Sequence, residues 1–141
     1  MDDRPRFDAK YLVGIQQVDR EHQQLFEIVA RVYDNLGAND PTPEAVTRAL
    51  VAELLDYTAT HFSSEEHLMA AAGYPELEAH RGQHQHLLAQ ARDMEMRAAI
   101  GDRHMPVELS HFLYRWLVEH IEASDRKFGE FVAARSAESR R

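Results

Sequence analysis

The stretch His61-Phe62-Ser63-Ser64-Glu65, followed by His80-Arg81-Gly82-Gln83-His84, decides the fold of this chain. Each half places two metal-binding side chains four residues apart, and on a helix positions i and i+4 lie on one face, one turn apart. The break Ala72-Gly73-Tyr74-Pro75 between the halves predicts a turn that sets one helix beside the other. The two pairs are therefore expected to face each other inside a helical bundle.

Apolar residues recur at spacings of three and four along four segments, a pattern typical of amphipathic helices. The segments begin near Asp19, Thr42, Pro75 and Pro106, and breaks at 37–41 and 101–102 end the first and third. Asp19 is predicted to be a helix N-cap whose carboxylate accepts a backbone N–H of the first turn. We expect an all-α protein with an up-down-up-down four-helix bundle.

The expected organisation is one domain over residues 1–141, a usual domain size. An ordered amino-terminal arm (1–18) precedes a bundle over about 19–134, and a polar, frayed tail (135–141) follows it. The arm is expected to pack because it carries several apolar residues. They are Tyr11, Leu12, Val13, Ile15 and Val18.

Composition excludes several classes of partner and site. The net charge of −8 disfavours binding to nucleic acid or to an anionic membrane. The absence of cysteine excludes disulfides, thiolate zinc sites and all-cysteine iron–sulfur clusters. No apolar run reaches membrane-spanning length, and no signal peptide follows Met1. We expect a cytoplasmic monomer.

Each predicted helix carries at least one metal-binding group on its apolar stripe. The seven residues are His22, His61, Glu65, His80, His84, His120 and Asp125. A single buried histidine is commonly a hydrogen-bonded core residue. Five imidazoles and two carboxylates in one core would each need partners or cost several kcal/mol in desolvation. A metal site supplies those partners together.

Seven ligands are too many for one tetrahedral ion, so the sequence favours two ions. The mixed donor set suits iron, zinc or manganese, and Glu65 and Asp125 are the candidates to bridge the ions. His120 and Asp125 lie five residues apart, and a π-bulge would bring them onto one face. The neighbouring acid Glu66 is interpreted as a surface charge. The remaining histidines are interpreted as solvated: His67, His86, His104 and His111.

The order His22, His61-x-x-x-Glu65, His80-x-x-x-His84, His120-x-x-x-x-Asp125 resembles the hemerythrin family, specifically its single-domain bacteriohemerythrins. The resemblance runs from about Tyr11 to Phe131 and includes the segments Val13-Gly14-Ile15 and Trp116-Leu117-x-x-His120-Ile121. One departure is Phe7, where bacterial relatives often carry tryptophan before the Val-Gly-Ile segment. It concerns the packing of the arm and leaves the ligand pattern unchanged.

The resemblance implies two irons per chain, one held by His80, His84 and His120 and the other by His22 and His61. It implies that Glu65, Asp125 and a solvent-derived oxo or hydroxo group bridge the irons. The second iron would keep an open position for dioxygen. The implied oxygen pocket consists of Phe62, Trp116, Leu117 and Ile121, which are also expected to be core residues.

The function implied is reversible dioxygen binding by a carrier, storage or delivery protein, without catalytic residues. Two alternatives stay open. A di-iron oxidase or reductase would act on dioxygen, peroxide or nitric oxide, although the ferritin-like Glu-x-x-His spacing occurs here only at Glu108 and His111, off the ligand set. An oxygen or redox sensor would need a separate, transient protein partner, because the chain has no room for a signalling domain.

Overall fold

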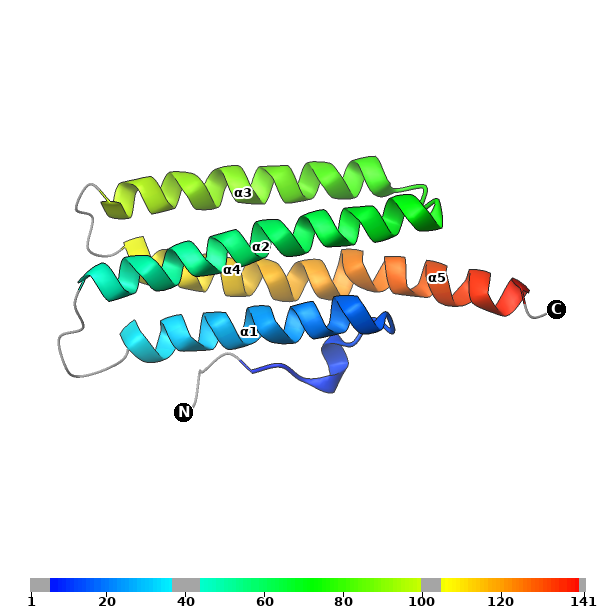
Figure 1. Cartoon of the computed structure of the whole chain (residues 1–141), viewed down its shortest axis with the longest axis horizontal. Helices are drawn as coiled ribbons and strands as arrows, with labels where there is room; N and C mark the ends of the chain where they lie inside the picture. Colours follow the sequence, from blue (N-terminus) through cyan, green and yellow to red (C-terminus); the bar gives the residue numbers. More distant parts are fainter. Residues whose placement is uncertain (1–5, 37–43, 100–104, 140–141) are drawn as a thin grey trace.

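The structure, a computed structural model, describes residues 6–36, 44–99 and 105–139. Within these ranges the chain forms four long helices and no strand (Figure 1). The first three are α1 (Gln16–Leu36), α2 (Glu44–Ala72) and α3 (Leu77–Ala99). The fourth is built from α4 (Met105–His120), the π-helical segment η2 (Ile121–Asp125) and α5 (Arg126–Ser139).

Successive helices run in opposite directions and lie side by side (Figure 1). α1 packs against α2 and α4, and α3 packs against the same two helices. The predicted up-down-up-down four-helix bundle is confirmed. None of the helices in the described ranges combines the length and the apolar character that crossing a membrane requires.

Two of the predicted helix starts agree with the structure. The helices expected near Pro75 and Pro106 begin at Leu77 and Met105. The predicted cap at Thr42 and the breaks at 37–41 and 101–102 lie outside the described residues.

The prediction that Asp19 caps the first helix is wrong, because α1 already begins at Gln16. The Asp19 carboxylate instead accepts hydrogen bonds from the backbone N–H groups of Val13 (2.8 Å) and Gly14 (3.2 Å). Gly14 has a φ of +88°, a conformation that glycine adopts without strain. Asp19 therefore ties the end of the arm to the helix that follows it.

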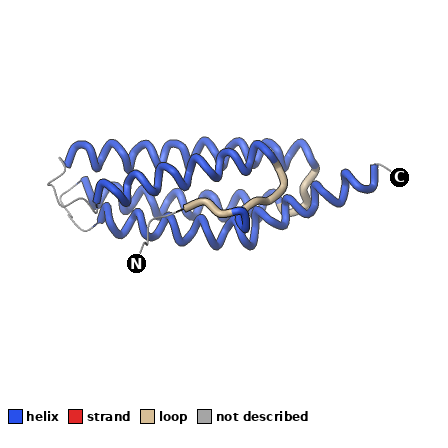
Figure 2. The backbone as a smooth tube through the Cα atoms, turned by 90° about the horizontal axis from the view of Figure 1, so that it is seen from below, coloured by secondary structure: helices blue, strands red, loops and turns tan. Residues whose placement is uncertain are grey.

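The arm lies along the outside of the bundle, as predicted (Figure 2). Its short 3₁₀ helix η1 (Ala9–Tyr11) places the ring of Tyr11 in a stack on Phe26, with the centroids 5.1 Å apart. Val13 and Val18 are buried in the same cluster. Leu12 is the exception to the prediction, because it is 48% exposed.

The turn between α2 and α3 follows the predicted break. Gly73 has a φ of +69° and donates to Ala70 O (3.1 Å), while Tyr74 donates to Met69 O (2.9 Å). These bonds form a Schellman motif, which satisfies carbonyl groups at the end of α2. Tyr74 then packs its ring on Phe128 at a centroid distance of 5.1 Å. The turn thus brings α3 back beside α2.

The fourth helix contains the predicted widening, because residues Ile121–Asp125 are π-helical. The prediction of a frayed tail from residue 135 is wrong, since α5 continues to Ser139 and projects past the other helices (Figure 1). Arg135 donates to the carbonyl oxygen of Ala72, which ties α5 to the end of α2.

The main core follows the predicted apolar stripes. It joins residues of all four helices, which are Leu25, Ile28, Val29, Val32, Val51, Leu54, Leu55, Phe62, Leu87, Ala91, Leu109, Leu113 and Leu117. Burying a leucine or isoleucine side chain contributes about 1.5–3 kcal/mol. This packing fixes how each helix is rotated about its own axis, and so fixes which residues of the helix face the centre of the bundle.

The arm approaches α5 most closely at Gly129. A Cβ atom built on Gly129 would lie 2.0 Å from the carbonyl oxygen of Val13, which no real side chain tolerates. Glycine at this position lets the arm pack directly against the backbone of α5.

We predict that Gly129→Ala displaces the arm and lowers the free energy of unfolding by about 1–3 kcal/mol, the usual cost of forcing an extra group into a packed site. Chemical denaturation measures the loss, and trypsin cleavage after Lys10 should become faster.

Gly82→Ala is the matched control, because a Cβ on Gly82 of α3 meets nothing within 4 Å. It should raise stability by about 0.4–1 kcal/mol through the unfolded state. Equal cleavage after Lys10 in both variants would contradict the role of Gly129.

Candidate metal centre

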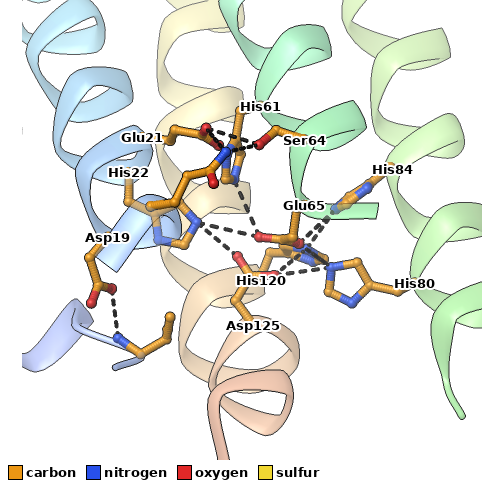
Figure 3. A network of polar contacts seen from close by, with 12 residues as sticks. Asp19, Glu21, His22, His61, Ser64, Glu65, His80, His84, His120 and Asp125 are labelled. Atoms are coloured by element: carbon orange, nitrogen blue, oxygen red, sulfur yellow. Dashed lines mark hydrogen bonds and ion pairs between the residues drawn. The ribbon is translucent and has the colours of Figure 1, made fainter. Parts of the chain in front are cut away.

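The structure brings all seven predicted ligand residues together in the centre of the bundle (Figure 3). Every helix contributes, and every one of these side chains is buried. They are His22 from α1, His61 and Glu65 from α2, His80 and His84 from α3, His120 at the end of α4, and Asp125 at the end of η2.

The seven residues divide into two groups that share both carboxylates. One group consists of Glu65, His80, His84, His120 and Asp125, and the other of His22, His61, Glu65 and Asp125. In each group the potential ligand atoms lie within 4.8 Å of one another. We call these the three-histidine side and the two-histidine side.

Each carboxylate turns a different oxygen toward each side. Glu65 Oε1 lies 2.6 Å from His80 Nε2, while its Oε2 lies 3.4 Å from His61 Nε2. Asp125 Oδ1 lies 3.0 Å from His120 Nε2, while its Oδ2 lies 3.0 Å from His22 Nε2. A carboxylate in this orientation can serve both sides at once.

The π-helical segment makes this arrangement possible. Asp125 follows His120 by five positions, and on an ideal α-helix the two would lie about 140° apart. The wider turn of η2 places both side chains toward the centre, with 3.0 Å between Asp125 Oδ1 and His120 Nε2. The observed segment therefore confirms the interpretation of the five-residue spacing.

The imidazole nitrogens on the three-histidine side face one another. His120 Nε2 lies 3.0 Å from His80 Nε2 and 3.1 Å from His84 Nε2. Nitrogens this close together could bind one ion, and Glu65 Oε1 of the same group lies 2.6 Å from His80 Nε2 and 3.4 Å from His84 Nε2.

Several buried polar atoms of the site make no hydrogen bond among the described residues. They are both ring nitrogens of His22, Glu65 Oε2 and both carboxylate oxygens of Asp125. Some of these atoms lie within ion-pair distance of one another, such as His22 Nε2 and Asp125 Oδ2 at 3.0 Å. An unpartnered buried polar group costs about 1–3 kcal/mol. Metal ions would give these atoms their missing partners, so the residues fit such a group.

The electrostatics of the site also demand positive charge. Burial raises the pKa of the Asp125 carboxyl, but the neighbouring histidines outweigh it and hold that pKa well below its usual value. Burial lowers the pKa of His61, but the hydrogen bond to Glu21 and the nearby negative charges of Glu65 and Asp125 outweigh it and raise that pKa to about 9. The carboxyls of the core therefore favour their ionised form, which suits a site for cations.

Two further carboxylates orient ligand histidines, and the sequence analysis missed both. Glu21 of α1 accepts from His61 Nδ1 at 2.7 Å, and Glu66 of α2 accepts from His84 Nδ1 at 2.9 Å. The interpretation of Glu66 as a surface charge is wrong, because its side chain is only 20% exposed. Metal-binding histidines usually donate their second ring N–H to a carboxylate or a similar acceptor. Acidic residues beside the predicted ligands could therefore have been considered as such partners.

Two of the predicted pocket residues stack on histidines of the centre, and a third lies in the main core. Phe62 stacks on His84 with the ring centroids 3.7 Å apart and the planes 2° apart. Trp116 stacks on His120 at 4.3 Å and 16°. Leu117 shares the main core with Phe62.

The fourth predicted pocket residue, Ile121, packs in a different cluster with residues of the arm. Leu25, which follows His22 by one turn of α1, lies in the same core cluster as Phe62 and Leu117. Leu25 was not among the predicted pocket residues. The role of this apolar wall in oxygen binding stays a prediction.

The histidines interpreted as solvated are exposed where the structure describes them: His67, His86 and His111. His104 lies outside the described residues.

Known proteins resemble this chain over most of its length. It is 30% identical to bacteriohemerythrin from Stenotrophomonas maltophilia over 122 residues, which are 86% of this chain and 77% of that protein. It is 32% identical to bacteriohemerythrin from Pseudomonas aeruginosa over 84% of this chain and 75% of that protein. Bacteriohemerythrin from Methylococcus capsulatus is 27% identical over 89% of this chain and 94% of its own length.

A solved structure of hemerythrin shares the fold. A crystal structure of wild-type hemerythrin superposes with a TM-score of 0.79 at 25% identity, over 88% of this chain and 94% of that one. The family model described as the Hemerythrin HHE cation binding domain matches residues 13–132. That range includes all seven residues of the buried centre, and the chain belongs to the hemerythrin family.

Proposed function

We propose that the chain holds two iron ions and binds dioxygen reversibly. His80, His84 and His120 would hold one ion, and His22 and His61 the other. Glu65 and Asp125 would bridge them, together with a solvent-derived oxo or hydroxo group. The observation that carries this proposal is that both carboxylates turn one oxygen toward each side.

The unequal number of histidines gives the two sides different roles. The family resemblance implies that the two-histidine side, which has one histidine fewer, would be the side that leaves a place for dioxygen. When bound, ferrous ions would supply the electrons for holding dioxygen.

The chain's own contribution is an apolar wall without proton donors. Leu25, Phe62 and Leu117 are buried together in the main core, and none of these side chains can donate a proton. The ring of Phe62 also fixes His84 by stacking. A wall of this kind excludes water from the bound gas, which favours release of unchanged dioxygen over its reduction.

The relatives named bacteriohemerythrin support this proposal. We infer a binding protein and not an enzyme. Repeated cycles of oxygen and argon over the reduced protein test the function, followed by the visible spectrum. A carrier regains the oxygenated spectrum in every cycle, whereas an oxidase loses it in the first. A sensor would regain it and also bind a partner only in one state.

We predict two irons per chain after anaerobic reconstitution, because the two sides each offer at least four donors. Elemental analysis against protein concentration measures the ratio. One ion per chain, or a stable preference for zinc in iron-replete cells, would contradict the proposal.

We predict that Glu65→Ala and Asp125→Ala each lose iron and about 3–5 kcal/mol of stability, because the remaining buried charges lose a partner. Iron content and denaturant unfolding measure the two effects. The exposed His86 provides the control, and His86→Ala should change neither. Retention of two irons and reversible oxygenation in either carboxylate variant would disprove the bridging role.

We predict that Leu117→Ala still binds two irons and dioxygen but oxidises in air several-fold faster than the parent. The truncation opens a cavity beside polar ligands, which admits water. Decay of the oxygenated spectrum measures the rate.

General loosening of the core also speeds oxidation, so Leu117→Ala needs a matched comparison. Leu109 is equally buried and lies two turns earlier on the same helix. Both truncations should cost about 2–5 kcal/mol. Equal acceleration in Leu109→Ala and Leu117→Ala would leave Leu117 as ordinary core.

A further inference from the structure

Glu21 lies behind the two-histidine side, outside the seven residues of the centre. It comes from α1 and reaches across to α2, where its Oε1 accepts a hydrogen bond from His61 Nδ1 at 2.7 Å (Figure 3). Its side chain is 19% exposed, so most of it is shielded from water. A charge-assisted hydrogen bond of this length is among the stronger ones in proteins.

Neutral groups hold Glu21 in this position. Its second oxygen accepts from Ser64 Oγ at 3.0 Å and from Gln17 Nε2 at 3.2 Å. Gln17 Nε2 also lies 2.8 Å from Ser64 Oγ, which closes a small network between α1 and α2. Both carboxylate oxygens of Glu21 are therefore fixed, and so is the direction from which it meets His61.

Glu66, the corresponding carboxylate on the three-histidine side, has a different environment. It accepts from His84 Nδ1 at 2.9 Å, and Arg81 Nε donates to its other oxygen at 3.0 Å. The arginine offsets the charge of Glu66. Among the residues that the structure describes, no lysine or arginine forms an ion pair with Glu21, so no basic side chain there offsets its charge.

His61 is the histidine of the two-histidine side that has an orienting carboxylate, whereas His22 has none among the described residues. Both ring nitrogens of His22 lack a hydrogen bond among the described residues. Glu21 is thus the orienting carboxylate of the two-histidine side in the described structure. A neutral imidazole carries its proton on one nitrogen, and the hydrogen bond at that nitrogen decides which one remains free to bind a metal.

We propose that Glu21 is a positioning residue that keeps the proton of His61 on Nδ1 and directs Nε2 toward the ion with the open position. This inference rests on the proposed function. The uncompensated charge of Glu21 also makes His61 a stronger donor. The protein thereby strengthens the side that has fewer histidines.

The first test is the release of iron from the reconstituted full chain to a chelator. Glu21→Ala should release one of its two ions about 10–100-fold faster than the parent, the usual effect of losing such a partner. The other ion should leave at the parental rate. Glu21→Gln keeps an acceptor oxygen without the charge, so its faster ion should leave at an intermediate rate.

Glu53→Ala is the matched control. Glu53 also links α2 to α1, through a 2.7 Å ion pair with Arg31, but it lies away from the metal centre. It should leave both rates unchanged, which separates positioning from loosening of the α1–α2 contact. Equal acceleration in Glu53→Ala and Glu21→Ala would overturn the inference.

The second test observes the tautomer by NMR of the zinc-loaded full chain. The parent should show a slowly exchanging Nδ1–H signal for His61, and Glu21→Ala should lose it while that of His84 remains. An unchanged His61 signal or unchanged iron release in Glu21→Ala would overturn the role of Glu21. A parent that holds fewer than two irons would instead overturn the proposed function.

Discussion

Two carboxylates buried among five imidazoles impose the main constraint on this fold. The neighbouring histidines lower the pKa of both Glu65 and Asp125, which favours ionised carboxylates in the core, and the oxygens of Asp125 lack hydrogen bonds among the described residues. Such charges are costly unless cations lie beside them. Every helix must therefore bring its ligand to one point, which fixes the rotation of each helix. The core leucines, the Schellman turn after α2 and the π-helical segment all serve that convergence.

The seven residues of the centre could be predicted from the sequence because helical spacing shows which residues share a face, and their roles as iron ligands stay a prediction. His61 and Glu65 lie one turn apart, and the five-residue gap from His120 to Asp125 pointed to the π-helical segment. Contacts between helices could not be predicted in the same way. They depend on how two helices are rotated relative to each other, and the spacing within one helix does not show this. Glu66 was misinterpreted for this reason: its partner, His84, lies on another helix.

The start of α1 and the end of α5 could also not be predicted from the sequence pattern. Aspartate is a common helix cap, but the carboxylate of Asp19 instead accepts a hydrogen bond from Val13 N, in the arm before the helix. The last turns of α5 look like a solvated tail, yet Arg135 anchors them to Ala72 across the bundle. In both cases a hydrogen bond to a backbone group outside the helix overrides a local preference.

Anomalous diffraction at the iron edge from crystals of the reconstituted protein tests the central claim most directly. The account predicts two iron peaks, one beside His80, His84 and His120 and the other beside His22 and His61. Glu65 and Asp125 should each place one oxygen on each peak. A single peak, or a carboxylate that binds only one of two irons, would contradict the shared-carboxylate centre.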